Sequence, residues 1–119
     1  MSTNIVQYVV VRRDVVKTLK WPLEALIAQA CHACTAVMHN FYEHPDTQNY
    51  LKDLDNMHKV ILEAKDEESL KSLSNVLTEN NIDHKLWIEQ PENISTCVAV
   101  RPYNKETVQK FFKEFKLFR

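Results

Sequence analysis

Four cationic side chains stand close together just after the first strand-like run of the sequence: Arg12, Arg13, Lys17 and Lys20. The helix predicted to follow them has an electropositive N-terminus that accepts anions. In open α/β sheets, ligands favour the carboxyl ends of the parallel strands, which is where these side chains are expected. The pattern indicates a phosphate or RNA-backbone site, and a solvated charged loop is the alternative interpretation.

Three further side chains could transfer a proton or hold a water molecule. His32 lies on a predicted helix over residues 22–41, away from its apolar stripe, where an imidazole could act in a cleft. Glu89 ends the third predicted strand and Thr96 begins the fourth, so a carboxylate and a hydroxyl could position water across a hairpin. A structural histidine, an edge charge and an ordinary strand threonine are the alternatives.

The three cysteines do not complete a metal site. Cys31 and Cys34 have C-x-x-C spacing, but both are predicted to point to the core, and no second pair of ligands follows. We expect these two residues, and Cys97 on a strand, to behave as small buried hydrophobic residues. An odd number of cysteines in a chain that can fold without disulfides indicates a reducing compartment. We therefore expect a cytoplasmic protein without a metal or cofactor.

The chain has 119 residues and no glycine. This length suits one domain, so residues 1–119 are expected to form a single unit. Without glycine, the dinucleotide-binding, Walker A, kinase and G-x-S-x-G loops are excluded. The 15 basic and 16 acidic residues give a net charge of −1, so any basic surface for nucleic acid must be local. No stretch predicts a membrane span.

Hydrophobic spacing predicts the elements that must position these side chains. Apolar, β-branched runs predict strands over 5–12 and 58–63, and shorter runs predict strands over 85–89 and 96–101. Helices are predicted over 22–41, 47–55 and 66–79, with a last one from Asn104. The main order, strand–helix–strand–helix–strand–strand–helix, implies parallel neighbours and one antiparallel pair. We predict an α/β fold, a three-layer α/β/α sandwich with a mixed four-stranded sheet.

The helix over 22–41 has an unusual outer face. Its apolar stripe, which includes Leu23, Ile27 and the two C-x-x-C cysteines, is predicted to face the core. The opposite face carries small and neutral residues, with Gln29 and His32 among them, instead of the lysine and glutamate of a solvated face. We therefore expect another segment to cover this face or a cleft to open there.

Four collinear segments that span nearly the whole chain carry further motifs. They read V-R-R-D at 11–14, L-I-A-Q-A-C-H-A at 26–33, K-V-I-L-E-A at 59–64 and T-C-V-A-V-R-P at 96–102. Together they resemble the archaeal and eukaryotic (type 2) peptidyl-tRNA hydrolase family. The run L-W-I-E-Q-P-E-N-I at 86–94 is similar to a eukaryotic branch of peptidyl-tRNA hydrolase domain-containing proteins. The resemblance implies a mixed sheet between helices, and metal-independent hydrolysis of the peptide–tRNA ester during cytosolic rescue of stalled translation.

The resemblance also implies roles for single residues. The positions that match the family pattern are Arg12, Asp14, Gln29, His32 and Thr96. In this interpretation Glu89 orients or deprotonates water, and His32 with Thr96 hydrogen-bonds the reacting carbonyl or ribose. The four cations after the first strand would hold tRNA phosphates.

Two family features are missing from the sequence. Ala25 stands where the family has a lysine, although Lys17 or Lys20 could replace that lysine in space. Glu89 is the nearest match to the Asp of a D-A-G-x-T segment whose glycine and first threonine have no counterpart. Three functions therefore stay open: a hydrolase, a catalytically impaired homologue that binds tRNA or a protein, and a small-molecule-binding domain. A homodimer is compatible with each.

Overall fold

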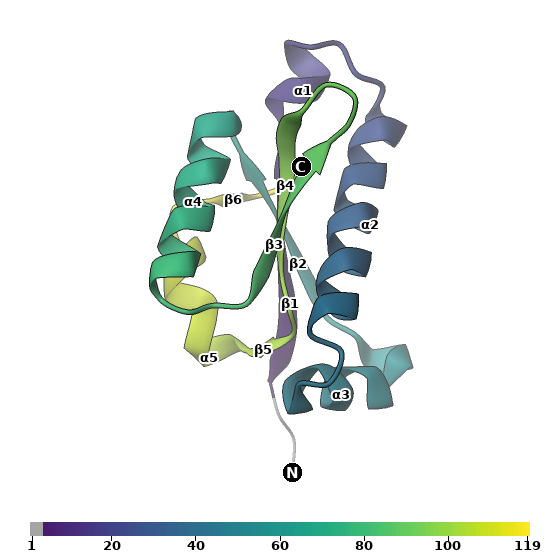
Figure 1. Ribbon diagram of the computed structural model, residues 1–119, viewed down its shortest axis with the longest axis vertical. Helices are drawn as coiled ribbons and strands as arrows, with labels where there is room; N and C mark the ends of the chain where they lie inside the picture. The colour runs from purple at the N-terminus through teal and green to yellow at the C-terminus, as the bar shows by residue number, and fades with distance from the viewer. Residues whose placement is uncertain (1–3) are drawn as a thin grey trace.

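The computed structural model describes residues 4–119, which form one mixed sheet between two layers of helices (Figure 1). The strands are β1 (Ile5–Arg12), β2 (Lys59–Ala64), β3 (His84–Glu89), β4 (Ile94–Val100), β5 (Tyr103–Asn104) and β6 (Lys116–Leu117). The helices are α1 (Asp14–Lys17), α2 (Leu23–Asn40), α3 (Pro45–Lys52), α4 (Glu67–Glu79) and α5 (Lys105–Val108), with 3-10 turns η1 (Leu54–Asn56) and η2 (Gln109–Phe112). None of the helices in residues 4–119 is both long and apolar enough to cross a membrane.

The sheet has the strand order β3-β4-β1-β2-β6, and β5 pairs with the N-terminal end of β1. Strands β1 and β2 are parallel, and all other pairs are antiparallel. The predicted α/β class and mixed sheet are confirmed, but the sheet has six strands and not four. The difference is the two-residue strands β5 and β6, which are too short to show a period in the sequence.

Strand β1 separates two hydrophobic cores. Val6, Tyr8 and Val10 pack with α4 and the C-terminal aromatic residues, and Val9 and Val11 pack with α2 on the other face. Burial on both faces explains why this strand reads as a continuous hydrophobic run and not as an alternating one. Figure 1 shows α2 on one side of the sheet, with α4 and α5 on the other.

Helix α2 is rotated relative to the prediction. Leu23 and Ile27 are 54% and 56% exposed, Cys31 is exposed, and Cys34 is only half-buried. The prediction that both C-x-x-C thiols point to the core is wrong for Cys31, whereas Cys34 packs against the core and Cys97 is buried as expected. The buried line of the helix is Leu26, Gln29, Ala33 and Val37. It also follows three- and four-residue steps, and it includes a glutamine that hydrophobicity alone would place outside.

The C-terminal segment is also less helical than predicted. Only Lys105–Val108 is α-helical, and the 3-10 turn Gln109–Phe112 follows it. Phe112 is buried and stacks on Tyr8, with 4.3 Å between ring centroids. The chain then turns back to lay β6 along β2. Burial of aromatic rings against the sheet, which is a tertiary effect, overrides the helical spacing of the phenylalanines.

Without glycine, other residues occupy the left-handed backbone positions. Lys20, Asn81 and Asn93 have φ values of 62°, 58° and 59°. Asn81 follows the end of α4, and Asn93 closes the turn between β3 and β4. Asparagine tolerates this conformation better than most residues. Lys20 adopts it in the loop before α2, where the chain reverses direction.

Candidate functional site

A β-bulge lies near the start of β4. Trp87 of β3 pairs with Cys97, but the next residue, Ile88, pairs with Ser95. Thr96 is therefore an extra residue on β4 without a partner on β3. Bulges redirect side chains and occur frequently beside active sites. Strict alternation along β4 would have placed Thr96 on the face that packs against α4.

The bulge brings Thr96 into contact with α2. The Thr96 hydroxyl donates a 2.9 Å hydrogen bond to Gln29 Oε1, and both residues are buried. Gln29 Nε2 donates in turn to the carbonyl of Ala25, one helical turn earlier, at 3.1 Å. The structure thus joins two predicted site residues that are 67 positions apart in the sequence. Because the Thr96 hydroxyl is buried and engaged, it positions Gln29 and the first turns of α2.

His32 and Glu89 are linked through Trp87. The His32 and Trp87 rings lie 5.0 Å apart between centroids at an interplanar angle of 32°. Trp87 Nε1 donates a 2.9 Å hydrogen bond to Glu89 Oε1. Trp87 was not predicted as a site residue, although its position two residues before Glu89 places both side chains on the same face of β3. His32 is exposed, so its imidazole is open to an incoming group.

Five residues form a seam between α2 and the hairpin of β3 and β4. We call Gln29, His32, Trp87, Glu89 and Thr96 the seam residues. Gln29 and His32 are neighbours on one helix face because they are three residues apart. The carboxyl end of β3 lies at the same end of the sheet as that of β1, since both strands run antiparallel to β4. The seam combines an imidazole, a carboxylate and a braced amide, which are groups suited to proton transfer and to holding water.

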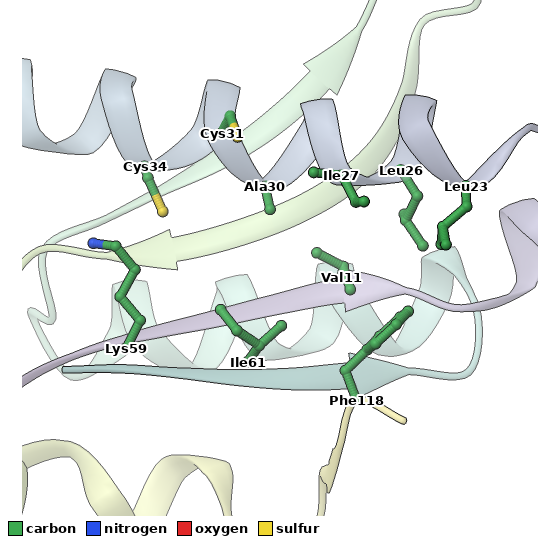
Figure 2. Close-up of a pocket in the computed structure, with 10 residues that line it drawn as sticks. All are labelled: Val11, Leu23, Leu26, Ile27, Ala30, Cys31, Cys34, Lys59, Ile61 and Phe118. Atoms are coloured by element: carbon green, nitrogen blue, oxygen red, sulfur yellow. The ribbon is translucent and has the colours of Figure 1, made fainter.

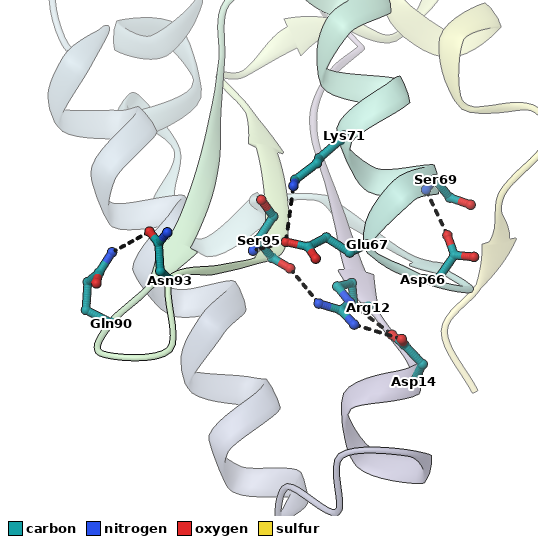
Figure 3. A network of polar contacts seen from close by, with 9 residues as sticks. All are labelled: Arg12, Asp14, Asp66, Glu67, Ser69, Lys71, Gln90, Asn93 and Ser95. Carbon is teal, nitrogen blue, oxygen red and sulfur yellow. Dashed lines mark hydrogen bonds and ion pairs between the residues drawn. The ribbon is translucent and has the colours of Figure 1, made fainter.

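Arg12 and Asp14 fix the start of β4 (Figure 3). Arg12 Nε and Nη2 donate to the two carboxylate oxygens of Asp14 at 3.0 and 2.8 Å, and Nη1 donates to the Ser95 carbonyl at 3.1 Å. From the other side, the Ser95 N–H donates to Glu67 Oε2 at 2.8 Å. This hydrogen bond holds the pKa of Glu67 below its usual range. Ser95, the neighbour of Thr96, is therefore held from both sides, and the guanidinium of Arg12 is buried and occupied.

Two of the other predicted cations, Arg13 and Lys17, line a separate cleft. It has a volume of about 400 Å³ and is lined by Arg13, Lys17, Lys116, Arg119 and one acidic residue, Glu63. Arg13 lies 3.6 Å from the Glu63 carboxylate, donates to the Arg119 carbonyl and packs over the ring of Phe118. Lys20 is exposed in the loop before α2. Lys116 and Arg119 were not predicted, because only the pairing of β6 with β2 brings them here.

A protein metal site needs several ligating side chains close together. Within residues 4–119, no three or more His, Cys, Asp or Glu side chains lie close enough together to hold a metal ion.

Comparison with known proteins connects this geometry to a family. The model of the family "Peptidyl-tRNA hydrolase PTH2" matches residues 5–118. Proteins named "Putative peptidyl-tRNA hydrolase PTRHD1" from Mus musculus and Homo sapiens are each 53% identical to this chain over 116 residues. Those matches cover 97% of this chain and 83% of each relative. The resemblance found in the sequence is confirmed, and the chain belongs to the PTH2 family of peptidyl-tRNA hydrolases.

Proposed function

We propose that this protein hydrolyses the ester that joins a peptide, or an acylated amino acid, to tRNA, without a metal ion. Such a reaction would return tRNA from stalled translation in the cytoplasm. Family membership supports the reaction class. The observation that carries the proposal is that Gln29, His32 and Thr96, three positions that match the family pattern, lie with Glu89 along one seam.

Glu89 and His32 are the proposed catalytic residues. One oxygen of the Glu89 carboxylate accepts the Trp87 N–H, and the second oxygen can accept a proton from a water molecule. As that water attacks the ester carbonyl, one of its protons passes to Glu89, and the same proton is then delivered to the ribose oxygen as the C–O bond to the acyl carbon breaks. His32 is exposed and stacked on Trp87, where it can hydrogen-bond the carbonyl or the ribose. Thr96, Gln29, Arg12 and Asp14 act as positioning residues.

The basic cleft is the proposed site for tRNA phosphates. Arg13, Lys17, Lys116 and Arg119 outnumber the single carboxylate of Glu63 there. Lys20 adds a cation at the same end of the sheet. Each phosphate contact releases counterions, so affinity for tRNA should fall steeply as salt is raised. Arg12 does not belong to this group, because its guanidinium is bound to Asp14 and Ser95.

The test is single-turnover hydrolysis of a labelled, N-blocked aminoacyl-tRNA, with and without EDTA. Glu89→Gln and His32→Ala should each lower the rate by about a hundredfold, the usual loss when a general acid or base is removed. Glu92→Gln, in the exposed turn beside Glu89, and His39→Ala, exposed on the same helix as His32, are matched controls and should keep the rate. Unchanged rates in Glu89→Gln and His32→Ala would remove both assigned roles.

A second candidate function is tRNA binding without hydrolysis. Ala25 stands at the position of the family lysine, and its carbonyl accepts the Gln29 bond. Within residues 4–119, no lysine or arginine side chain is hydrogen-bonded or ion-paired to a seam side chain. This function predicts salt-dependent tRNA binding with no turnover at high protein concentration, in the same assay.

A further inference from the structure

An apolar groove runs along the flank of α2 that faces away from the seam (Figure 2). Its volume is about 350 Å³, and α2, β1, β2 and the C-terminal segment form its walls. Leu23 and Ile27 border it from the helix, and Ile61 and Phe118 border it from the opposite wall. The exposure of Leu23 and Ile27 is unusual for large apolar residues of a helix packed on a sheet. The strand order β3-β4-β1-β2 places the groove and the seam on opposite sides of α2.

The far wall of the groove is held in place by specific contacts. The Phe118 N–H donates a 2.9 Å hydrogen bond to the Ile61 carbonyl. The Arg13 guanidinium lies over the Phe118 ring, 4.4 Å from its centroid. The groove is therefore formed in advance, as small-molecule sites usually are, and its volume lies in their usual range of roughly 300–1,000 Å³.

Among the residues that line the groove, Lys59 alone is charged, and both of its hydrogen-bond acceptors are neutral. The Lys59 ammonium donates to Gln7 Oε1 and to the Tyr50 hydroxyl. Burial raises the pKa of Tyr50 to about 12 and raises the pKa of the Cys34 thiol, so neither supplies a negative charge at neutral pH. Gln7 is fully buried, and its Nε2 is fixed to the Val100 carbonyl at 3.0 Å. No ion pair of residues 4–119 includes Lys59.

Lys59 is therefore a positioned cation without a countercharge. An ammonium group has three donors, and the two acceptors leave one proton free. Lys59 is exposed as a residue, and partial desolvation of its ammonium group lowers its pKa. Figure 2 shows its side chain rising from β2 toward Cys34, at the opposite end of the groove from Leu23 and Phe118.

We propose that this groove binds an apolar monocarboxylate, with the carboxylate on the Lys59 ammonium and the aliphatic or aromatic body extending along α2 toward Phe118. The carboxylate supplies the missing countercharge, and the body removes Leu23 and Ile27 from water. The binding is separate from the proposed hydrolysis, because it involves none of the seam residues and needs no ester chemistry.

The test is calorimetric titration of the intact protein with three ligands that share one chain: octanoate, octan-1-ol and octylammonium. Octanoate should bind, and octanol and octylammonium should bind at least about tenfold more weakly, as expected when a charged hydrogen bond is lost. Shortening octanoate should cost roughly fourfold in affinity for each methylene removed. Equal affinity for octanoate and octanol, or no binding of any of the three, would overturn the proposal.

Two variants locate the site. Lys59→Met should weaken octanoate binding about tenfold and leave octanol binding unchanged. Lys52→Met, at an exposed lysine of α3, is the matched control and should change neither. Ile27→Gln should weaken both ligands, and because Ile27 is largely exposed this variant remains informative even if Lys59→Met folds poorly. Unchanged octanoate affinity in either groove variant would contradict the assignment, whatever the outcome of the hydrolysis assay.

Discussion

Arg12 and Arg101 occupy similar settings at opposite ends of the sheet. Their exposed fractions are 6% and 5%, and each guanidinium binds carboxylate and a backbone carbonyl. Arg12 pairs with Asp14, two residues away, and with the Ser95 carbonyl at the start of β4. The same type of contact therefore occurs both beside the candidate active site and far from it.

The two arginines differ in what their partners hold together. Arg101 pairs with Asp83 at 2.9 Å and with Asp46 of α3 at 3.1 Å, and it packs 3.6 Å over the ring of Tyr103. It therefore ties α3 and the segment before β3 to the end of β4. Arg12 holds Asp14, close by in the sequence, and Ser95, the residue next to the bulge. A buried arginine in a sequence motif is thus not in itself a phosphate ligand, because its partners decide what it does.

The largest expected effect on stability is at Arg101. Arg101→Met would leave Asp46 and Asp83 without their cation and should lower the free energy of unfolding by about 3 kcal/mol. This is the lower end of the range for a broken buried ion pair, because both aspartates are partly exposed. Urea denaturation measures this loss. Single-turnover hydrolysis, at a temperature where the variant is folded, should stay close to the wild-type rate. A large loss of rate would remove the distinction between the two arginines.

Arg12→Met should have the next largest effect, and it should affect both properties. We expect about 2–3 kcal/mol of lost stability, together with at least a tenfold lower hydrolysis rate, because the start of β4 loses its anchor. Affinity for tRNA and its dependence on salt should not change. The slope of log affinity against log salt concentration could instead become shallower by about one unit. In that case Arg12 is a phosphate ligand after all.

Thr96→Val tests the bulge directly. The valine keeps the shape of threonine but leaves Gln29 Oε1 buried without its donor, which should cost about 1–3 kcal/mol. Thr96→Ser retains the hydroxyl and should lose less. Thermal unfolding of the two variants, compared with their hydrolysis rates, separates the hydrogen bond from the methyl group. Equal losses in both would show that packing, and not the bond to Gln29, is what matters.

Glu67 should make stability depend on pH at acidic values. Its carboxylate accepts the Ser95 N–H, so its pKa is lower in the folded than in the unfolded protein. The resulting stabilisation is present above the unfolded pKa of about 4.3 and is lost as pH falls through the folded pKa. Glu67→Gln should reduce the free energy of unfolding by about 1 kcal/mol at neutral pH. The variant should also lose less stability than the wild type between neutral and acidic pH. An unchanged pH profile would show that this contact is not stabilising.

Lys17→Ala and Lys116→Ala should have the smallest effects on stability, within about 0.5 kcal/mol, because both side chains are exposed. Each should nevertheless make the salt dependence of tRNA binding shallower, by nearly one unit of slope for every phosphate that the lysine neutralises. Lys85→Ala, on β3 and away from the cleft, is the control. Equal slopes in all three variants would place the tRNA phosphates elsewhere on the surface.

Much of the fold could be predicted because local patterns and packing agree. The apolar run of β1 and the spacing of α4 each specify one structure, and both were predicted. The rotation of α2 was not, because a buried glutamine satisfied by Thr96 looks polar in the sequence. Similarly, the phenylalanines of the C-terminal segment have helical spacing, but contact with Tyr8 decides their conformation.

The candidate site was only partly predictable, because it depends on how the strands pair with one another. The residue types of His32, Glu89 and Gln29 were informative. The bulge that brings Thr96 to Gln29 depends on the pairing of β3 with β4, which one strand alone does not reveal. The same holds for Lys116 and Arg119, since they join the basic cleft only through β6.

The short strand β6 has a further consequence for self-association. It pairs with Leu62 and Glu63, and Phe118 adds a hydrogen bond to Ile61. Without these few residues, β2 would present the unpaired N–H and C=O groups of its edge to solvent, and such edges template pairing between molecules. Proteolytic trimming after Phe115 should therefore make the protein more prone to aggregate, and it should also dismantle the groove and the basic cleft.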